Sequence, residues 1–250
     1  MSSAVTAVPP SPSDHTLARP KQALQRDARF GASLLRRHGW RLLLLFAGVL
    51  LPLWGFAELA DEVREHEGFF FDEPILITAN AMARSGFIQL FLFFSAIGYE
   101  YGVVPVDIAL VLALGLRRRY RESVFAAIAT GGSALLNIAA KQFFARDRPS
   151  LWESIAPEHN YSFPSGHAMG SMTLALVLLA LAWPTRWRWP LLAVMALFVP
   201  MVGLSRVYLG VHYPSDILAG WTAALVWTMG VYLVVFRGQL RPWRRQEMGA

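Results

Sequence analysis

Long runs of apolar residues alternate with short polar segments along most of the chain. A membrane-crossing helix needs about 17 to 25 mostly apolar residues, because its length must match the hydrocarbon core of the bilayer. Six runs approach or exceed that length: Trp40–Ala57, Tyr101–Leu116, Glu122–Phe144, Ser165–Trp183, Trp189–Tyr208 and Pro214–Phe236. The pattern therefore predicts an all-α protein, an integral membrane bundle of six transmembrane helices.

Two further segments leave the pattern incomplete. Ser85–Gly98 is apolar but short for a span of its own, so it is either an interfacial helix or the first half of a bent helix that continues to Leu116. The acidic stretch Asp61–Glu73 favours a helix on the outer membrane surface, with Phe69–Phe71 among the headgroups. A metal site around His66 is the less favoured interpretation of that stretch.

Composition supports the membrane assignment. The chain is 55% hydrophobic and 16% charged, with a mean hydropathy of +0.39, whereas soluble domains carry about 25% charged residues. It contains no cysteine, which excludes disulfides, thiolate metal sites and cysteine nucleophiles. The net charge of +6 does not indicate nucleic-acid binding, because the basic residues gather at the ends of the predicted spans.

The polar ends frame a single membrane domain. Residues 1–38 contain Ser, Pro and Arg without apolar periodicity, which predicts a mobile cytosolic tail. They do not resemble a signal peptide, since the first apolar run begins near Trp40. Residues 39–236 form the six-span domain, and residues 237–250 form a basic cytosolic tail.

The distribution of charge predicts the orientation. With six spans, one face collects 17 of the 23 basic residues, which are Arg19, Lys21, Arg26, Arg29, Arg36, Arg37, Arg41, Arg117, Arg118, Arg119, Arg121, Arg186, Arg188, Arg237, Arg241, Arg244 and Arg245. The positive-inside rule makes this face cytoplasmic, with both termini inside. The other face receives Arg64, Arg84, Lys141, Arg146, Arg148 and Arg206.

Three polar stretches fall on this second face. They are KQFFARDRP at Lys141–Pro149, PSGH at Pro164–His167 and SRVYLGVHYPSD at Ser205–Asp216. Each stands at the outer end of a predicted span, so antiparallel packing of helices joined by short loops brings them together.

The residue types in these stretches suit a phosphoryl group. Lys141, Arg148 and Arg206 provide cations, and arginine grips phosphate oxygens in pairs. The backbone N–H groups around Gly166 open a helix, which is a site for anions. Asp216 follows His212 by four residues, so one helical turn brings the carboxylate to the imidazole and fixes its tautomer.

The order K-x6-RP, PSGH and SR-x5-H-x3-D resembles the signature of the type 2 phosphatidic acid phosphatase family of membrane lipid phosphatases, which acid phosphatases and vanadium haloperoxidases share. The resemblance covers roughly Arg117–Phe236. It implies that His212 attacks phosphorus, that Asp216 orients His212, and that His167 protonates the leaving oxygen and then activates water. The residues implied to hold the phosphate are Lys141, Arg148, Ser165, Gly166 and Arg206. No metal or other cofactor is implied, because the cations and the helix N-terminus supply the positive charge.

The resemblance also implies the partners and the compartment. The substrate is a lipid phosphate in the bilayer, foremost undecaprenyl diphosphate or phosphatidylglycerophosphate, and the enzyme belongs in a bacterial inner membrane with its site facing the periplasm. The alternatives are a lipid A phosphatase of the same family and a non-catalytic protein that binds or transports anionic lipids. The two histidines and Asp216 favour an enzyme, because binding requires no such set. The variable segments Asp61–Arg84 and Ser150–Asn160 are expected to select the lipid.

Several of these residues have simpler structural interpretations. PSGH alone is an ordinary helix start. Arg146 falls at no motif position, so it is either part of the site or an interfacial cation for lipid headgroups. Asp147 is expected to pair with a neighbouring arginine, and Asn137 to order Lys141. Asp107, inside a span, is either functional or engaged in a buried hydrogen bond.

Overall fold

The computed structural model describes residues 39, 42–65, 68–82, 85–152, 154, 156–236 and 242–243. The chain divides into two units, Met1–Leu44 and Leu45–Ala250, and the helices described here belong to the second. The predicted tail 1–38 and most of the predicted tail 237–250 lie outside the described residues. A π-helical turn, η1 (Phe46–Leu50), precedes eight α-helices in the described part: α2 (Leu51–Arg64), α3 (Asp72–Ala81), α4 (Ser85–Ile97), α5 (Val103–Leu116), α6 (Tyr120–Phe144), α7 (Gly166–Ala182), α8 (Arg188–Tyr208) and α9 (Pro214–Val235).

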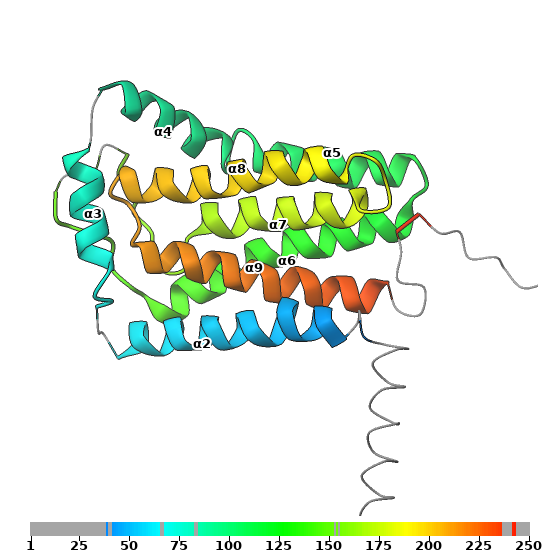
Figure 1. Ribbon diagram of the computed structural model, residues 1–250, viewed down its shortest axis with the longest axis horizontal. Coiled ribbons are helices and arrows are strands. Elements are labelled where there is room, and N and C mark those ends of the chain that lie inside the picture. The colour runs from blue at the N-terminus through cyan, green and yellow to red at the C-terminus, as the bar shows by residue number, and fades with distance from the viewer. Residues whose placement is uncertain are drawn as a thin grey trace, which may run out of the picture. The chain divides into compact units, whose positions relative to one another are not determined.

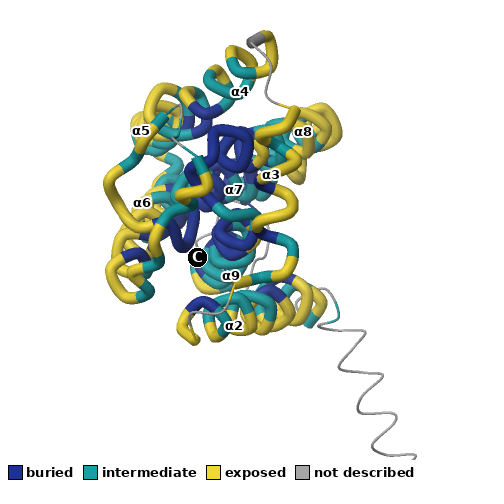
Figure 2. The backbone as a smooth tube through the Cα atoms, turned by 90° about the vertical axis from the view of Figure 1, so that its left-hand side faces the viewer, coloured by how far each residue is buried: buried dark blue, intermediate teal, exposed yellow. Residues whose placement is uncertain are grey.

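Helix α7 forms the centre of a helical bundle (Figures 1 and 2). It packs against α5, α6, α8 and α9, while α2 lies beside α9 and α4 lies beside α8. Helix α7 is rich in Gly, Ala, Ser and Thr, and such small residues allow neighbouring helices to approach closely inside a membrane. The short α3 crosses the end of the bundle at which α9 begins (Figure 1).

One glycine fixes the contact between α7 and α9. A Cβ atom at Gly220 would lie 2.8 Å from the carbonyl oxygen of Ser165 and 3.1 Å from the backbone nitrogen of Met169. Any larger residue would force the two helices apart. The first turns of α7 and α9, which carry the PSGH and H-x3-D motifs, are therefore held side by side.

The long helices agree with the predicted spans. Four are long and apolar enough to cross a membrane: Leu42–Arg64, Tyr120–Phe144, Arg188–Tyr208 and Pro214–Val235. The shorter apolar helices are Gly86–Ile97, Val103–Leu116 and Gly166–Ala182. Large apolar side chains remain exposed on the outer surfaces of these helices, among them Leu112, Leu135, Leu197 and Val234, as expected for helices that face lipid.

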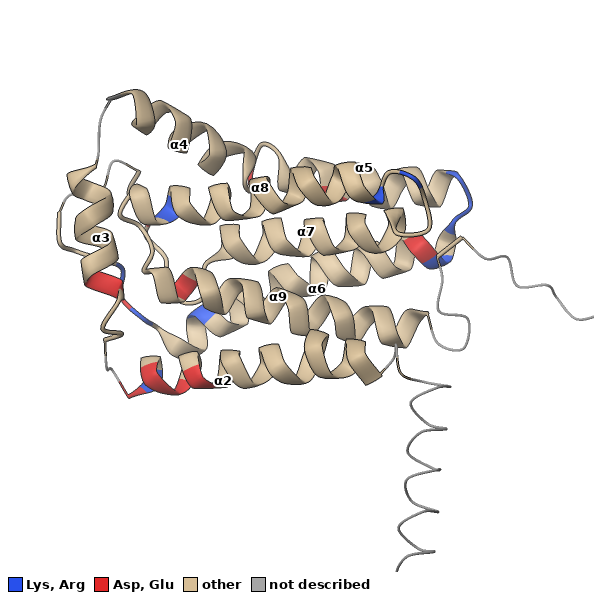
Figure 3. Cartoon of the chain, viewed as in Figure 1, with Lys and Arg blue, Asp and Glu red and all other residues tan. Residues whose placement is uncertain are grey.

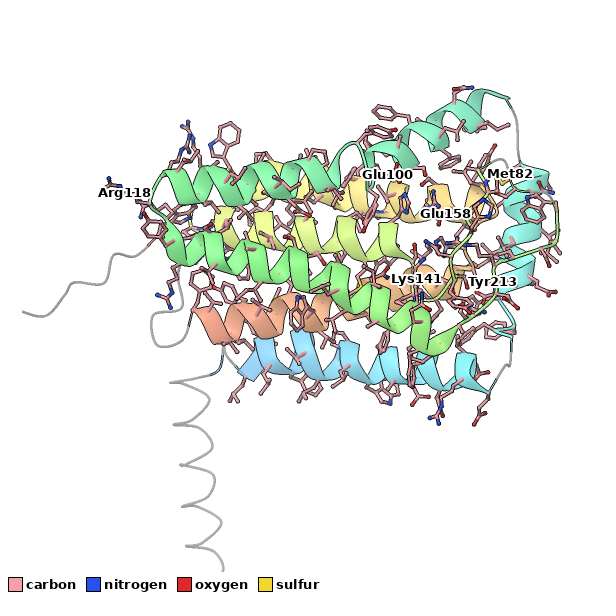
Figure 4. All side chains as sticks on the ribbon, turned by 180° about the vertical axis from the view of Figure 1, so that it is seen from behind. Met82, Glu100, Arg118, Lys141, Glu158 and Tyr213 are labelled. Atoms are coloured by element: carbon pink, nitrogen blue, oxygen red, sulfur yellow. The ribbon has the colours of Figure 1, made fainter. Side chains whose placement is uncertain are left out.

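The segment Ser85–Gly98 forms α4. This helix leads into α5, and the two run along the same side of the bundle with a bend between them (Figures 1 and 4). At the bend, the N–H of Tyr101 donates to Ala96 O at 3.1 Å, one residue wider than an α-helical bond. A Cβ atom at Gly102 would lie 2.1 Å from Ile97 O, so only glycine permits this close passage. Ser85–Ile97 and Val103–Leu116 are therefore two helices joined by a bend, as the bent-helix interpretation describes. The interfacial interpretation concerns depth in the membrane and stays a prediction.

The acidic stretch Asp61–Glu73 does not form one interfacial helix, and that expectation was wrong. Helix α2 continues to Arg64, and α3 begins at Asp72. Helix α2 continues beyond its apolar run because residues 58–64 include Glu, Leu, Ala and Arg, which all have high helix propensity although Glu and Arg are charged. Asp72 is buried in spite of its charge, with 2% of its surface exposed.

Each end of the bundle carries its own group of basic residues. The turn between α5 and α6 contains Arg117, Arg118 and Arg119, and it lies at the end opposite α3 (Figure 3). Trp243 packs near this end, where its indole donates to Leu181 O at 2.7 Å. The end near α3 carries the cations of the predicted site.

Candidate active site

The three polar stretches meet at the end of the bundle covered by α3. Helices α6 and α8 finish there, and α7 and α9 begin there. In Figure 4, Lys141, Glu158 and Tyr213 lie at this end and Arg118 lies at the opposite one. The convergence that the sequence predicts is therefore present in the fold.

His212 is fully buried between a carboxylate and a guanidinium. Its Nδ1 lies 3.3 Å from Asp216 Oδ2, and its Nε2 lies 3.2 Å from Arg148 Nη1. Only Nδ1 has an acceptor, so that nitrogen carries the proton and Nε2 carries the lone pair. Burial lowers the pKa of His212 well below its ordinary 6.5, and the charges of Arg148 and Arg206 lower it further. The ring is therefore neutral, and the electron pair on Nε2 accepts a hydrogen bond from Arg148.

Asp216 owes its position to the start of α9. Pro214 occupies the first turn of that helix, where its missing N–H costs nothing. The Asp216 carboxylate turns back and accepts the N–H of Tyr213 at 2.9 Å. The same oxygen, Oδ2, faces the His212 ring, so one helix cap also orients the imidazole.

The guanidinium groups of Arg148 and Arg206 share one carboxylate, that of Glu158. Arg148 Nη2 bonds Glu158 Oε2 at 2.5 Å, and Arg206 Nη2 bonds Glu158 Oε1. Burial raises the pKa of Glu158, but Arg206 and the other nearby cations outweigh that effect and hold the pKa below its usual range. No motif in the sequence points to Glu158, which belongs to the loop between α6 and α7.

Lys141 completes the cluster of cations. It stands in the last turn of α6, and its ammonium donates to Asn160 Oδ1 at 3.0 Å and to Tyr161 O at 2.7 Å. Arg148 also bonds Asn160. The loop that carries Glu158 is thus bonded to all three cations.

Ser165 of the PSGH turn makes two hydrogen bonds within the protein. Ser165 caps α7, because its Oγ accepts the N–H of Ala168. Its own N–H donates to Asp216 O at 3.1 Å, so it is not directed at an anion. The amides of Gly166 and His167, which open the helix, have no intrahelical acceptors.

Asn137 was expected to order Lys141, and that expectation was wrong. In the structure it orders the PSGH turn. Its Nδ2 donates to Pro164 O at 3.0 Å. A Cβ atom at Gly166 would lie 3.0 Å from Asn137 Oδ1, so the glycine leaves room for this side chain.

His167 lies on the first turn of α7, with its ring 5.2 Å from that of Tyr99 between centroids. The charges of Arg206, Lys141 and Arg148 all act on the ring. Lys141, Arg148 and Arg206 therefore lie within electrostatic range of His167.

Arg146 and Asp72 join the site from outside the motif positions. Arg146 Nη1 lies 2.7 Å from Asp216 Oδ1, and Arg146 Nη2 lies 2.9 Å from Asp72 Oδ2. Arg146 is thus part of the site and not a headgroup-binding interfacial cation. Asp147 is exposed, and the ion pairs of Arg146 and Arg148 are made with other carboxylates, so the expected role of Asp147 was wrong.

Asp107 lies deeper, on α5, beside a cavity of about 40 Å³ that Ser133, Thr173 and Gly166 also line. Its Oδ1 is buried without a hydrogen-bond partner among the described residues. That observation disagrees with the expected buried hydrogen bond at this oxygen. The functional interpretation of Asp107 stays a prediction.

Comparisons with known proteins agree with the geometry. The PAP2 superfamily model matches residues 122–239. An undecaprenyl-diphosphatase of Sulfolobus acidocaldarius is 31% identical over 191 residues, which cover 73% of this chain and 84% of that protein. Phosphatidylglycerophosphatase B of Bacillus subtilis is 24% identical over 160 residues, which cover 62% of this chain and 78% of that protein.

The fold has a counterpart among solved structures. The crystal structure of a transmembrane PAP2-type phosphatidylglycerolphosphate phosphatase from Bacillus subtilis superimposes with a TM-score of 0.67 at 22% identity, and the match covers 78% of this chain and 98% of that one. These comparisons confirm the resemblance drawn from the three motifs. The chain therefore belongs to the PAP2 superfamily, as a lipid phosphatase embedded in the membrane by its apolar helices.

Proposed function

We propose that this enzyme hydrolyses a lipid phosphate or diphosphate through a phosphohistidine on His212. One observation carries the proposal: Nδ1 of the neutral ring is held by Asp216, while Nε2 points at Arg148. A nucleophile needs its free electron pair directed at the electrophile. A phosphate bound by Arg148 presents its phosphorus to that electron pair.

The reaction then has two steps. First, the Nε2 electron pair bonds to phosphorus as the bond from phosphorus to the lipid oxygen breaks, and His167 gives its proton to that oxygen. Second, His167 removes a proton from water, the hydroxide bonds to phosphorus, and the P–N bond breaks to return its electrons to Nε2. The products are the dephosphorylated lipid and orthophosphate, and His167 is protonated again.

Charge on the phosphoryl oxygens is balanced by the protein in this mechanism. Lys141, Arg148 and Arg206 provide three positive charges, and the amides of Gly166 and His167 add the N-terminus of α7. Ser165 supports these amides by capping the helix. We infer from this set of cations that hydrolysis requires no metal.

We further infer that the site faces the outside of the cell. The arginines of the α5–α6 turn mark the opposite end of the bundle (Figure 3), and such clusters are cytoplasmic. Intact cells should therefore hydrolyse a short-chain lipid phosphate that cannot cross the membrane. Hydrolysis that appears only after permeabilisation would place the site inside.

The substrates we propose are undecaprenyl diphosphate and phosphatidylglycerophosphate, with the first ahead. The names of the relatives from Sulfolobus acidocaldarius and Bacillus subtilis support these two lipids. Both lipids offer a terminal phosphate at the depth of the headgroups, where the site lies. A lipid A phosphatase remains the alternative within the same chemistry.

A panel assay tests the proposal. Purified enzyme in detergent receives undecaprenyl diphosphate, phosphatidylglycerophosphate, phosphatidate or lipid A at equal surface concentration, and released phosphate is measured. We expect undecaprenyl diphosphate or phosphatidylglycerophosphate to be cleaved fastest, with the rate unchanged by saturating EDTA. Faster cleavage of lipid A would overturn the choice of lipid, and a strict need for magnesium would overturn the mechanism.

Glu158 must leave the two arginines when a phosphate binds, because both anions use the same N–H donors. The substitution Glu158→Gln removes the competing charge. We expect vanadate, an analogue of the five-coordinate phosphoryl group, to inhibit this variant about 10-fold more tightly, equivalent to about 1.4 kcal/mol. The measurement is the inhibition constant in detergent.

Asp147→Asn is the matched control for this experiment. It removes one negative charge from the same loop, but Asp147 is exposed and forms none of the ion pairs of Arg148. Its inhibition constant should equal that of the wild type. Equal tightening in both variants would mean that only the net charge of the loop matters.

A further inference from the structure

The guanidinium of Arg146 connects two buried carboxylates that come from distant parts of the chain. Asp216 lies on α9 and is fully buried, and Asp72 lies on α3 with 2% of its surface exposed. Arg146 donates to one oxygen of each, at 2.7 Å and 2.9 Å respectively. Two buried negative charges this close are costly unless a cation balances them. Arg146 supplies that cation.

The two oxygens of Asp216 have separate tasks. Oδ1 accepts from Arg146, while Oδ2 accepts from the backbone of Tyr213 and faces Nδ1 of His212. The bond at Oδ1 prevents rotation of the carboxylate. Oδ2 therefore stays directed at the imidazole, which decides where the lone pair of the ring points.

Asp72 binds Ser215, the residue before Asp216, at the start of α9. Its Oδ1 accepts the N–H of Ser215 at 2.9 Å, and its Oδ2 accepts the hydroxyl of Ser215 at 2.5 Å. It thereby caps the first turn of α9 from a neighbouring helix. Arg146 also donates to the Ser215 hydroxyl at 2.8 Å and lies 4.2 Å from the ring centroid of Tyr213. Apart from the ion pair between Arg146 and Asp72, each bond in this network is made to the segment that carries Asp216.

We propose that Arg146 and Asp72 are positioning residues for the His212–Asp216 pair. Arg146 fixes the rotamer of Asp216 and withdraws negative charge from it, so that the shared proton remains on Nδ1 of His212. Asp72 fixes Arg146 and the first turn of α9. Asp72 lies outside residues 122–239, which match the family model, so α3 adds a part to the site that the family motifs do not contain. The proposal rests on the proposed nucleophilic role of His212.

The variants Arg146→Lys and Asp72→Asn test the proposal. Lysine keeps the charge but not the forked geometry, and asparagine removes one of the two carboxylates. We expect kcat to fall on the order of 10- to 100-fold in each, as misplacement of a reacting group predicts, with KM nearly unchanged. Combining both substitutions should cost less than the product of the two losses, because they disrupt one network.

The acid limb of the kcat/KM profile provides a readout that general loss of structure would not give. Without Arg146, the negative charge of Asp216 is no longer balanced, so it stabilises the protonated form of His212. The pKa of His212 then rises, and the acid limb moves to higher pH. Arg146→Met should show the largest movement. The other charged or titratable groups around His212 remain in place in every variant: Lys141, Arg148, Glu158, His167 and Arg206.

Glu73→Gln is the control, since Glu73 is exposed and adjacent to Asp72 on α3. Its kcat and pH profile should match those of the wild type, and thermal unfolding in detergent should show that all variants are folded. Wild-type kcat in folded Arg146→Lys and Asp72→Asn, together with an unmoved acid limb in folded Arg146→Met, would overturn the positioning role. Activity retained in a His212 variant would overturn the proposed function instead, so the two failures are distinct.

Discussion

Replacement of His212 by asparagine is expected to reduce kcat by at least about 10⁴-fold, the range found when a nucleophile or its base is removed from other hydrolases. Asparagine keeps a polar group of similar size beside Asp216 and Arg148, but it has no lone pair able to bond to phosphorus. The expected loss is therefore one of chemistry, and binding of the lipid phosphate should survive. The measurement is phosphate release from a short-chain lipid phosphate in detergent.

His159→Asn is the matched control for this experiment, because His159 is exposed on the loop that carries Glu158. Its activity should be that of the wild type. Both variants should elute and unfold like the wild-type enzyme. A folded His212→Asn protein that retains a tenth of the normal rate would exclude the phosphohistidine mechanism.

Replacement of His167 by asparagine should slow lipid hydrolysis on the order of 10²- to 10⁴-fold, the usual contribution of a general acid or base. The first step needs a proton because a lipid alkoxide is a poor leaving group. A p-nitrophenolate ion leaves without that proton. With p-nitrophenyl phosphate, the variant should therefore form the phosphoenzyme but hydrolyse it slowly.

This difference makes the second histidine testable apart from the first. Rapid quenching should reveal one burst of p-nitrophenol per enzyme and an acid-labile phosphoprotein in His167→Asn, and neither in the double variant that also lacks His212. Steady turnover of the lipid at the wild-type rate would show that His167 does not transfer the proton. Absence of a burst would show that His167 is needed before the P–O bond breaks.

The sequence predicted the helices well because lipid imposes a strong and local rule. Five of the predicted spans agree with helices to within about two residues at each end, for example Trp189–Tyr208 with α8 at Arg188–Tyr208. The apolar pattern did not locate the end of α2, since residues 58–64 continue the helix beyond the hydrocarbon length. It also left the bend between α4 and α5 open, because that bend depends on how Gly102 passes Ile97.

The candidate site was predictable only where its residues form a motif. His212 and Asp216 stand four residues apart, so their contact follows from helical geometry. Asp72 and Arg146 are separated by 74 residues, and no spacing rule connects them. One signal was available: Arg146 adds a third positive charge to a polar end of a span, and a buried cation there requires a counter-charge. Glu158 carried no comparable signal, since loops of this kind commonly contain solvated acids.

Glu158 also bears on how the site excludes the phosphodiester lipids of the surrounding bilayer. The bilayer around the bundle is crowded with phosphodiester lipids, each with a single negative charge on its phosphate, and three uncovered cations at headgroup depth would attract them continually. A carboxylate already bound to Arg148 and Arg206 must be displaced before any phosphate can bind them. We expect a terminal phosphate, with more charge and three free oxygens, to displace it more readily than a phosphodiester does. The resting contact would then favour a few substrate molecules over a vast excess of ordinary lipid.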